Sequence, residues 1–169
     1  MNVHPLIVHF PIACLVLYSL LEIGTVCFPR RAEKRKNTKL FLLFVGTLGT
    51  RAALQSGEVA SDLYGGGSRL IETHEDFAEK TYSVYGILSI HYLIWLLLLT
   101  DWVQKMVPTA VVTHIQTIIT WKYMKYIVAL IAIIGMTLLS ITGALWWAIA
   151  HGPDTDPVAR IVYDLFVGK

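Results

Sequence analysis

The sequence predicts an all-α fold: a single domain, residues 1–169, built as a bundle of four transmembrane helices that run up, down, up and down. Three observations predict this fold. Hydrophobic residues make up 55% of the chain and charged residues only 15%, whereas ordinary soluble domains carry about 25% charged residues. Four apolar segments reach the roughly 20 residues that a helix needs to cross a bilayer. Charged residues gather between those segments, and their sign alternates from one connection to the next.

The composition also excludes several classes of protein. A soluble globular enzyme or a disordered chain would be less apolar. A net charge of +2 is too small for a surface that binds nucleic acid. The two cysteines, Cys14 and Cys27, lie in one apolar segment. They are about 20 Å apart along a helix, so they cannot pair with each other. We therefore expect a membrane protein without a disulfide framework.

The predicted spans cover residues 5–28, 40–60, 82–100 and 126–150, and the second of them is the least apolar. No basic stretch precedes the first span and no small-residue cleavage site follows it. We therefore expect the first span to be a retained helix and not a cleaved signal peptide.

The charge of the connections predicts the orientation. Between residues 30 and 39 lie six lysines or arginines and one glutamate, and the third connection adds Lys105, Lys122 and Lys125 against Asp101. Residues 58–80 instead hold six acids and two basic residues, and the C-terminal tail is acidic too. Because basic residues stay in the cytoplasm, both basic connections are expected inside. Both termini and the acidic connection are then expected outside.

Two shorter segments are expected to lie at the membrane surface. Residues 109–121 place apolar side chains on one side and mostly threonines opposite, which is typical of a helix in the cytoplasmic interface. At residues 157–167, Asp156 and Pro157 form an N-cap followed by proline at the first helical position. The apolar residues that follow recur at helical spacing, which predicts a short helix over the outer end of the bundle.

Histidines at the ends of the predicted spans are the first candidates for chemistry. His4, His9, His74 and His151 are all expected at the outer face, and histidine is the commonest metal ligand and an axial ligand of haem iron. Each of them also has a plainer interpretation, as an interfacial polar residue or a helix cap. His91 lies about halfway through the third span, where an ionisable group indicates function or a hydrogen bond to a neighbouring helix. His114 is expected to be solvated.

Arg51 lies near the middle of the second predicted span. An arginine at that depth needs an anion or a water-filled cavity. The candidate partners are a haem propionate, an acid of the outer connection, or Glu22. Glu22 matches Arg51 poorly in depth, because it lies near the inner end of the first span.

Small residues form stripes on two of the predicted spans. On the second span these are Gly46, Gly49, Ala53 and Gly57, and on the fourth Gly135 and Gly143 are eight residues apart. Two interpretations stay open. The stripes either allow close packing between helices or leave room for a flat macrocycle against the backbone, with Gly49 among the contacts.

Acids surround His74, at Glu72, Glu75, Asp76 and Glu79. They lack the Glu-x-x-His spacing of di-iron bundles and are expected to form a solvated helix face. No Cys-x-x-Cys-His attachment motif is present. Any haem is therefore expected to be held non-covalently.

The opening run His4-Pro5-Leu6-Ile7-Val8-His9-Phe10-Pro11-Ile12 resembles the start of a family of bacterial four-helix membrane proteins, domain of unknown function 2231. The resemblance extends over residues 4–168 through Ser56-Gly57-Glu58, His74 and His151-Gly152. That family is distantly similar to membrane di-haem cytochromes b, which implies a haem-binding role. This chain departs from the family pattern by a longer acidic second connection and by its tail helix.

The expected function is therefore that of a b-type cytochrome subunit in the bacterial inner membrane. It would carry electrons near the periplasmic face as an electron-transfer subunit rather than a catalytic one. One non-covalent haem b is expected, with Arg51 holding a propionate. His9 and His74 are the first-choice axial ligands, because the first and third spans of such a bundle are diagonal. His151 with His9, or His4 with His74, are the fallback pairs.

The expected partners are membrane lipid, other subunits of a redox complex, and quinone or a periplasmic electron carrier. Two alternatives stay open. One is a non-haem metal site for copper, zinc or iron, built from the same histidines and nearby acids. The other is a cofactor-free anchor subunit of a larger membrane complex.

Overall fold

The computed structural model describes the backbone of residues 4–63 and 68–168, and side chains within these ranges except at 4–6, 31, 33 and 60–63. In the described ranges the chain is almost entirely helical and contains no strand, which confirms the all-α prediction. The long helices are α1 (His4–Cys27), α2 (Ala32–Leu63), α3 (Arg69–Leu97) and α6 (Met124–His151). The short elements are η1 (Pro29–Arg31), α4 (Asp101–Met106), α5 (Thr109–Ile119), η2 (Pro153–Thr155) and α7 (Pro157–Phe166).

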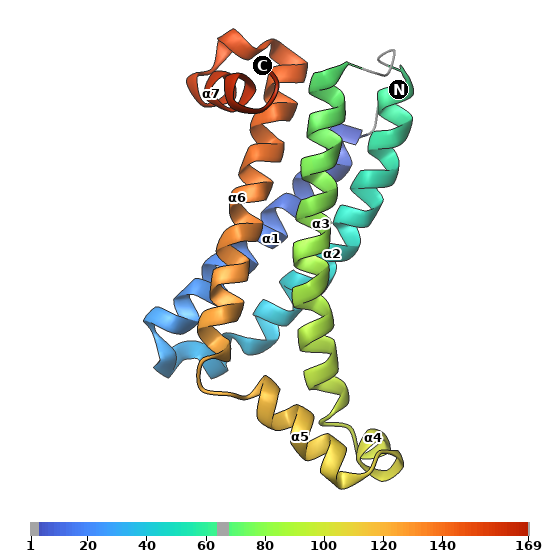
Figure 1. Ribbon diagram of the computed structural model, residues 1–169, viewed down its shortest axis with the longest axis vertical. Coiled ribbons are helices and arrows are strands. Elements are labelled where there is room, and N and C mark those ends of the chain that lie inside the picture. The colour runs from blue at the N-terminus through green and yellow to red at the C-terminus, as the bar shows by residue number, and fades with distance from the viewer. Residues whose placement is uncertain (1–3, 64–67, 169) are drawn as a thin grey trace.

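The long helices pack as a bundle with alternating direction (Figure 1). Helix α1 packs against α2 and α6, and α3 packs against the same two helices, so α1 and α3 lie diagonally opposite. Helix α7 sits at one end of the bundle, and α4 and α5 lie at the other. We refer to these as the α7 end and the α5 end. The α7 end is the predicted outer end, and the α5 end carries the basic connections.

Within the described residues, α6 and the segment Ile7–Cys27 of α1 are long and apolar enough to cross a membrane. Four spans were predicted, and two of the four long helices have the length and composition of a membrane span. The other two long helices, α2 and α3, fall short because charged residues interrupt their apolar runs. On α2 these include Lys39 and Arg51, and on α3 the acids of the first two turns.

The core of the bundle is apolar and is tied together by hydrogen bonds between helices. Its buried residues are Leu15, Tyr18, Leu43, Tyr85, Leu88, Val128, Ala132 and Leu139. The hydroxyls of Ser19 and Tyr85 are 2.8 Å apart and link α1 to α3. The hydroxyls of Thr47 and Ser89 are 3.0 Å apart and link α2 to α3.

Close approach of the helices accounts for most of the glycine stripes. A Cβ at Gly46 would lie 2.6 Å from Cδ2 of Leu15, and one at Gly49 would lie 3.0 Å from Cβ of Pro11. At Gly135 the nearest atom is a ring carbon of Tyr85, at 3.0 Å. These three glycines therefore serve helix packing.

Both predicted surface helices form. Helix α5 begins at the predicted residue, lies at the end that carries the basic connections, and ends two residues early, at Ile119. At α7 the Asp156 side chain accepts hydrogen bonds from the backbone N–H groups of Val158 and Ala159, as the N-cap prediction requires. The ring of Phe166 meets that of Phe77 edge to face at 4.8 Å, which holds α7 on the bundle.

Candidate functional site

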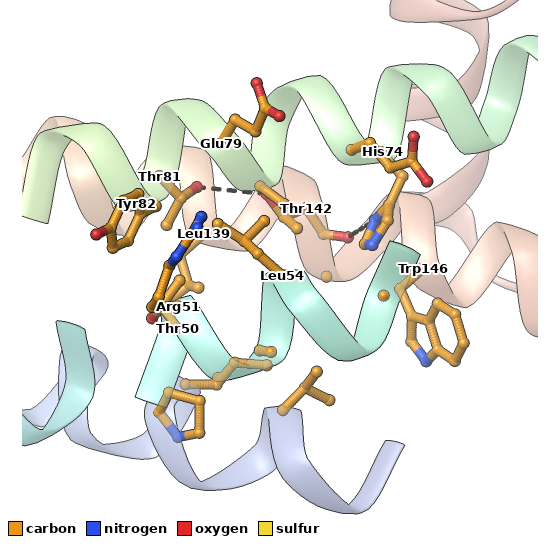
Figure 2. A pocket seen from close by; sticks show the side chains of 18 of the residues that line it. Thr50, Arg51, Leu54, His74, Glu79, Thr81, Tyr82, Leu139, Thr142 and Trp146 are labelled. Carbon is orange, nitrogen blue, oxygen red and sulfur yellow. Dashed lines mark hydrogen bonds between the residues drawn. The ribbon is translucent and has the colours of Figure 1, made fainter. Parts of the chain in front are cut away.

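A cavity of about 480 Å³ opens among α1, α2, α3 and α6 near the α7 end (Figure 2). We call it the α7-end cavity. Its walls are mainly apolar, and its polar groups include Arg51 from α2, His74 and Glu79 from α3, and Thr142 from α6. A volume of this size lies within the range of roughly 300–1,000 Å³ typical of small-molecule and cofactor sites. The cavity therefore joins residues that are distant in sequence in a space able to hold a ligand.

His74 is held on one side of the cavity by α6. Its Nδ1 lies 3.1 Å from the backbone carbonyl oxygen of Thr142, and its ring centroid is 5.9 Å from that of Trp146. A carbonyl oxygen only accepts hydrogen bonds, so Nδ1 carries the proton and Nε2 carries the lone pair. Histidines that bind metals almost always donate their other ring N–H in this way. The contact with Thr142 thus sets the tautomer of the neutral His74 ring.

Arg51 lines the same cavity. Figure 2 shows its side chain extending from α2 toward α3. No described residue forms an ion pair or a hydrogen bond with its guanidinium group, and this includes Glu58, Glu75 and Glu79, which also line the cavity. Among the described residues, no carboxylate therefore pairs with the guanidinium, which leaves it accessible to an anionic ligand or water.

The predicted ligands His9 and His151 lie outside the cavity lining. On α1 the cavity is lined by Val8, Pro11 and Ile12, whereas the side chain of His9 is exposed. His151 stacks on Trp147 at the end of α6, with 4.1 Å between the ring centroids. The side chain of His4 lies outside the described residues. Pairing of His9 with His74 stays a prediction.

Some glycines of the two stripes line the cavity and others do not. Gly49 packs on Pro11 and does not line the cavity, whereas Gly57 and Gly143 do. Gly143 has no atom within 4 Å of the position of a Cβ, so the cavity is open beside it. At this position the backbone is accessible to a flat ligand.

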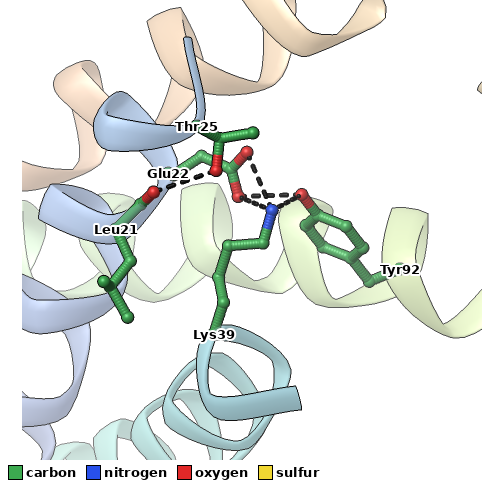
Figure 3. Close-up of polar contacts among 5 residues, drawn as sticks. All are labelled: Leu21, Glu22, Thr25, Lys39 and Tyr92. Carbon is green, nitrogen blue, oxygen red and sulfur yellow. Dashed lines mark hydrogen bonds and ion pairs between the residues drawn. The ribbon is translucent and has the colours of Figure 1, made fainter. Parts of the chain in front are cut away.

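A buried charge pair near the α5 end was not predicted (Figure 3). Nζ of Lys39 lies 2.9 Å from Oε2 of Glu22. The hydroxyl of Tyr92 donates to the same oxygen at 2.8 Å and accepts from Lys39 at 2.9 Å. Glu22 is 1% exposed and Lys39 is 8% exposed. The available signal was Glu22 itself, a carboxylate inside a predicted span that requires a partner.

The remaining histidines lie near that end as well. His91 is half-buried on α3 next to Tyr92, and His114 is exposed on α5, as expected. Among the described residues, no group of three or more histidines, cysteines or acids is placed to hold a metal ion.

Comparisons with family models, with curated proteins and with solved structures found no match to this chain.

Proposed function

We propose that this chain is a membrane protein whose four long helices all span the bilayer. For α2 and α3, the support is that charged side chains of α2 lie inside the bundle, while the outward faces of both helices carry apolar side chains. Lys39 is paired inside the bundle and Arg51 lines the cavity. The outward faces of these helices instead carry apolar side chains, which include Phe41 and Leu48 on α2 and Ile87 and Ile90 on α3. Such an exterior suits lipid as the solvent.

Two further observations support the membrane position. Only 22% of the most apolar window of α6 is buried, whereas a helix in the core of a soluble protein would be mostly buried. Along α3, His74 and Tyr92 are 18 residues apart, about 27 Å, which matches the roughly 30 Å hydrocarbon layer. The α7-end cavity then lies at one interface and the Glu22–Lys39 pair near the other. The positive charge of the connections at the α5 end supports a cytoplasmic position for that end.

We propose that the α7-end cavity binds haem b and that the chain is a b-type cytochrome subunit of the inner membrane, with its haem near the periplasmic face. The observation that carries this proposal is the cavity that brings together His74, whose Nδ1 donates to Thr142, and Arg51, which forms no ion pair with any described acid. His74 would hold the haem iron through Nε2, and Arg51 would bind a propionate. The apolar walls would exclude water. The haem itself would supply one-electron redox chemistry.

The residues that line the cavity fit this group as a site with one histidine. Arg51 and His74 come from different helices, and open backbone at Gly143 leaves room for a flat ring. Electrons would pass to other subunits, to quinone or to a periplasmic carrier. His9, on the same outer half of the bundle, stays the predicted second ligand.

A reduced-minus-oxidised absorption spectrum of the protein purified from haem-sufficient membranes tests the proposal. We expect sharp haem bands and a stoichiometry near one haem per chain. Purified protein that is folded and carries neither the bands nor iron would contradict it.

The second candidate function is a cofactor-free anchor subunit, and one observation favours it. Helix α7 leaves Val158, Ile161 and Leu165 exposed on one face while Ala159 is buried on the other. A stable complex with other membrane proteins that persists without bound haem would support the anchor function over the cytochrome.

A further inference from the structure

A second cavity, of about 500 Å³, lies at the α5 end, and we call it the α5-end cavity. All four long helices contribute to it, together with the connection from α5 to α6. Its charged lining residues are Lys36, Lys39, Lys122, Lys125 and Glu22. No part of the proposed haem site lies here.

The lysines of this cavity leave an excess of positive charge. The single glutamate, Glu22, is matched by Lys39, whose ammonium group is fully engaged by Glu22 and Tyr92. No described acidic side chain forms an ion pair with Lys122 or Lys125. Lys122 and Lys125 each lie over a neighbouring tyrosine ring, at 4.7 and 4.9 Å from the ring centroids, and their charge is matched by no described acid.

The start of α6 adds to this positive potential. Helix α6 is 28 residues long, has no acid in its first turn and has no side-chain cap at Tyr123. Its first residues, Met124 and Lys125, line the cavity. The N–H groups of Met124 and Tyr126 donate to the carbonyls of Trp121 and Tyr123, so the contribution of α6 is the partial positive charge of its N-terminus, which favours an anion.

Aromatic side chains place the cavity at a membrane surface. Trp95 and Trp121 line it, and Nζ of Lys36 lies 4.2 Å from the centroid of the Trp95 ring. Tryptophan and tyrosine gather where a bilayer meets water, and basic pockets between helices on the cytoplasmic side bind phospholipid headgroups.

We propose that the α5-end cavity binds a phosphate group. Lys122, Lys125 and the N-terminus of α6 face the phosphate oxygens, and the Glu22–Lys39 pair closes the floor of the site. The phosphate belongs either to the headgroup of an anionic phospholipid or to a soluble phosphate ester. Both sources share the chemistry that these residues recognise.

The change in intrinsic tryptophan fluorescence on addition of each probe, to which Trp95 and Trp121 at the cavity contribute, provides the test, with the whole protein in a neutral detergent. The probes are dihexanoyl phosphatidylglycerol, dihexanoyl phosphatidylcholine and glycerol 3-phosphate. We expect saturable binding of the phosphatidylglycerol, weaker binding of the zwitterionic phosphatidylcholine, and weakening by salt. Displacement by glycerol 3-phosphate identifies a soluble ester as ligand, and the lack of displacement identifies the lipid headgroup.

The test protein carries both Lys122→Gln and Lys125→Gln. The matched control carries both Lys34→Gln and Lys105→Gln. The control removes the same charge from exposed positions outside the cavity. We expect the first pair to weaken phosphatidylglycerol binding about thirtyfold and the control to weaken it less than about threefold. Equal effects of the two pairs, no effect of the first, or equal binding of the two lipids would overturn the proposal. The salt dependence of the unaltered protein keeps the test valid if a variant fails to fold.

Discussion

Two cations on α2 are accommodated in different ways, and the difference separates structure from function. Lys39 is buried and forms an ion pair with Glu22, so its charge is matched within the protein. Arg51 lines a cavity and contacts no described acid. If α2 spans the membrane as proposed, a charge at that depth is costly without a partner, so we expect an anionic ligand to pair with Arg51.

Substitution of Arg51 tests that role. We expect Arg51→Leu to weaken haem retention about tenfold to hundredfold, because a hydrogen-bonded contact to a charged group is lost. Arg51→Lys should restore only part of the retention, since lysine cannot make the bidentate contact. The control is Gln55→Leu, one turn away on α2 and outside the cavity lining. The measurement is haem transfer to an acceptor protein, and equal transfer rates for Arg51→Leu and Gln55→Leu would contradict the propionate role.

The Glu22–Lys39 pair is expected to behave as a structural element. Lys39→Met leaves the Glu22 carboxylate buried without its partner, which should lower the free energy of unfolding by about 3–5 kcal/mol. Glu22→Gln combined with Lys39→Met removes both charges and should cost clearly less. Unfolding in mixed detergent micelles measures both variants, with Lys34→Met as an exposed control. A double variant that is less stable than Lys39→Met would show that the pair does not act as a unit.

At the scale of elements, apolar windows locate the long helices better than they predict where these helices begin and end. The first and fourth predicted spans, 5–28 and 126–150, agree within two residues at each end with α1 and α6. The windows 40–60 and 82–100 are only parts of α2 and α3. These helices continue through polar turns because their residues, mostly alanine, glutamate, lysine and arginine, favour a helix. The start of α3 was missed although Ser68 caps it through the backbone N–H of Ile71.

The glycines give a prediction at this scale. Gly46→Ala should destabilise the protein by about 1–3 kcal/mol, because the new methyl group meets the buried side chain of Leu15 where α1 and α2 touch. Gly143→Ala should be neutral or stabilising, since its Cβ meets nothing within 4 Å and alanine favours the helix. Unfolding in mixed micelles compares the two, and a Gly143→Ala cost as large as that of Gly46→Ala would contradict close α1–α2 packing as the cause.

The site was predictable where a single residue carries the signal. Arg51 and His74 stand out in the sequence because polar groups in or beside an apolar run are costly. The contacts around such residues could not be predicted from the sequence. Thr142 lies 68 residues from His74, and Tyr92 lies 70 residues from Glu22. Such contacts follow from how the helices rotate and cross, which sequence periodicity leaves open. The same rotation turns His9 away from the cavity and brings Pro11 to its wall.

For the whole molecule, the charge asymmetry predicts one orientation. Asn37→Cys and Glu72→Cys, each in a Cys14→Ala, Cys27→Ser background, place an exposed thiol at the α5 end and near the α7 end. In intact cells we expect a membrane-impermeant maleimide to label Glu72→Cys and to spare Asn37→Cys until the membrane is opened. Labelling of Asn37→Cys alone would reverse the orientation and move the α7-end cavity to the cytoplasmic face.

The haem content of histidine variants tests the proposed site most directly. His74→Ala removes the side chain that Thr142 orients into the cavity, whereas His114→Ala alters an exposed residue of α5. His9→Ala, in the same series, tests the predicted second ligand. We expect the purified His74→Ala protein to lose the sharp reduced-minus-oxidised bands, while the unaltered protein and His114→Ala keep them with equal haem per chain. A folded His74→Ala protein with full haem content and unchanged bands would contradict the haem site proposed for this cavity.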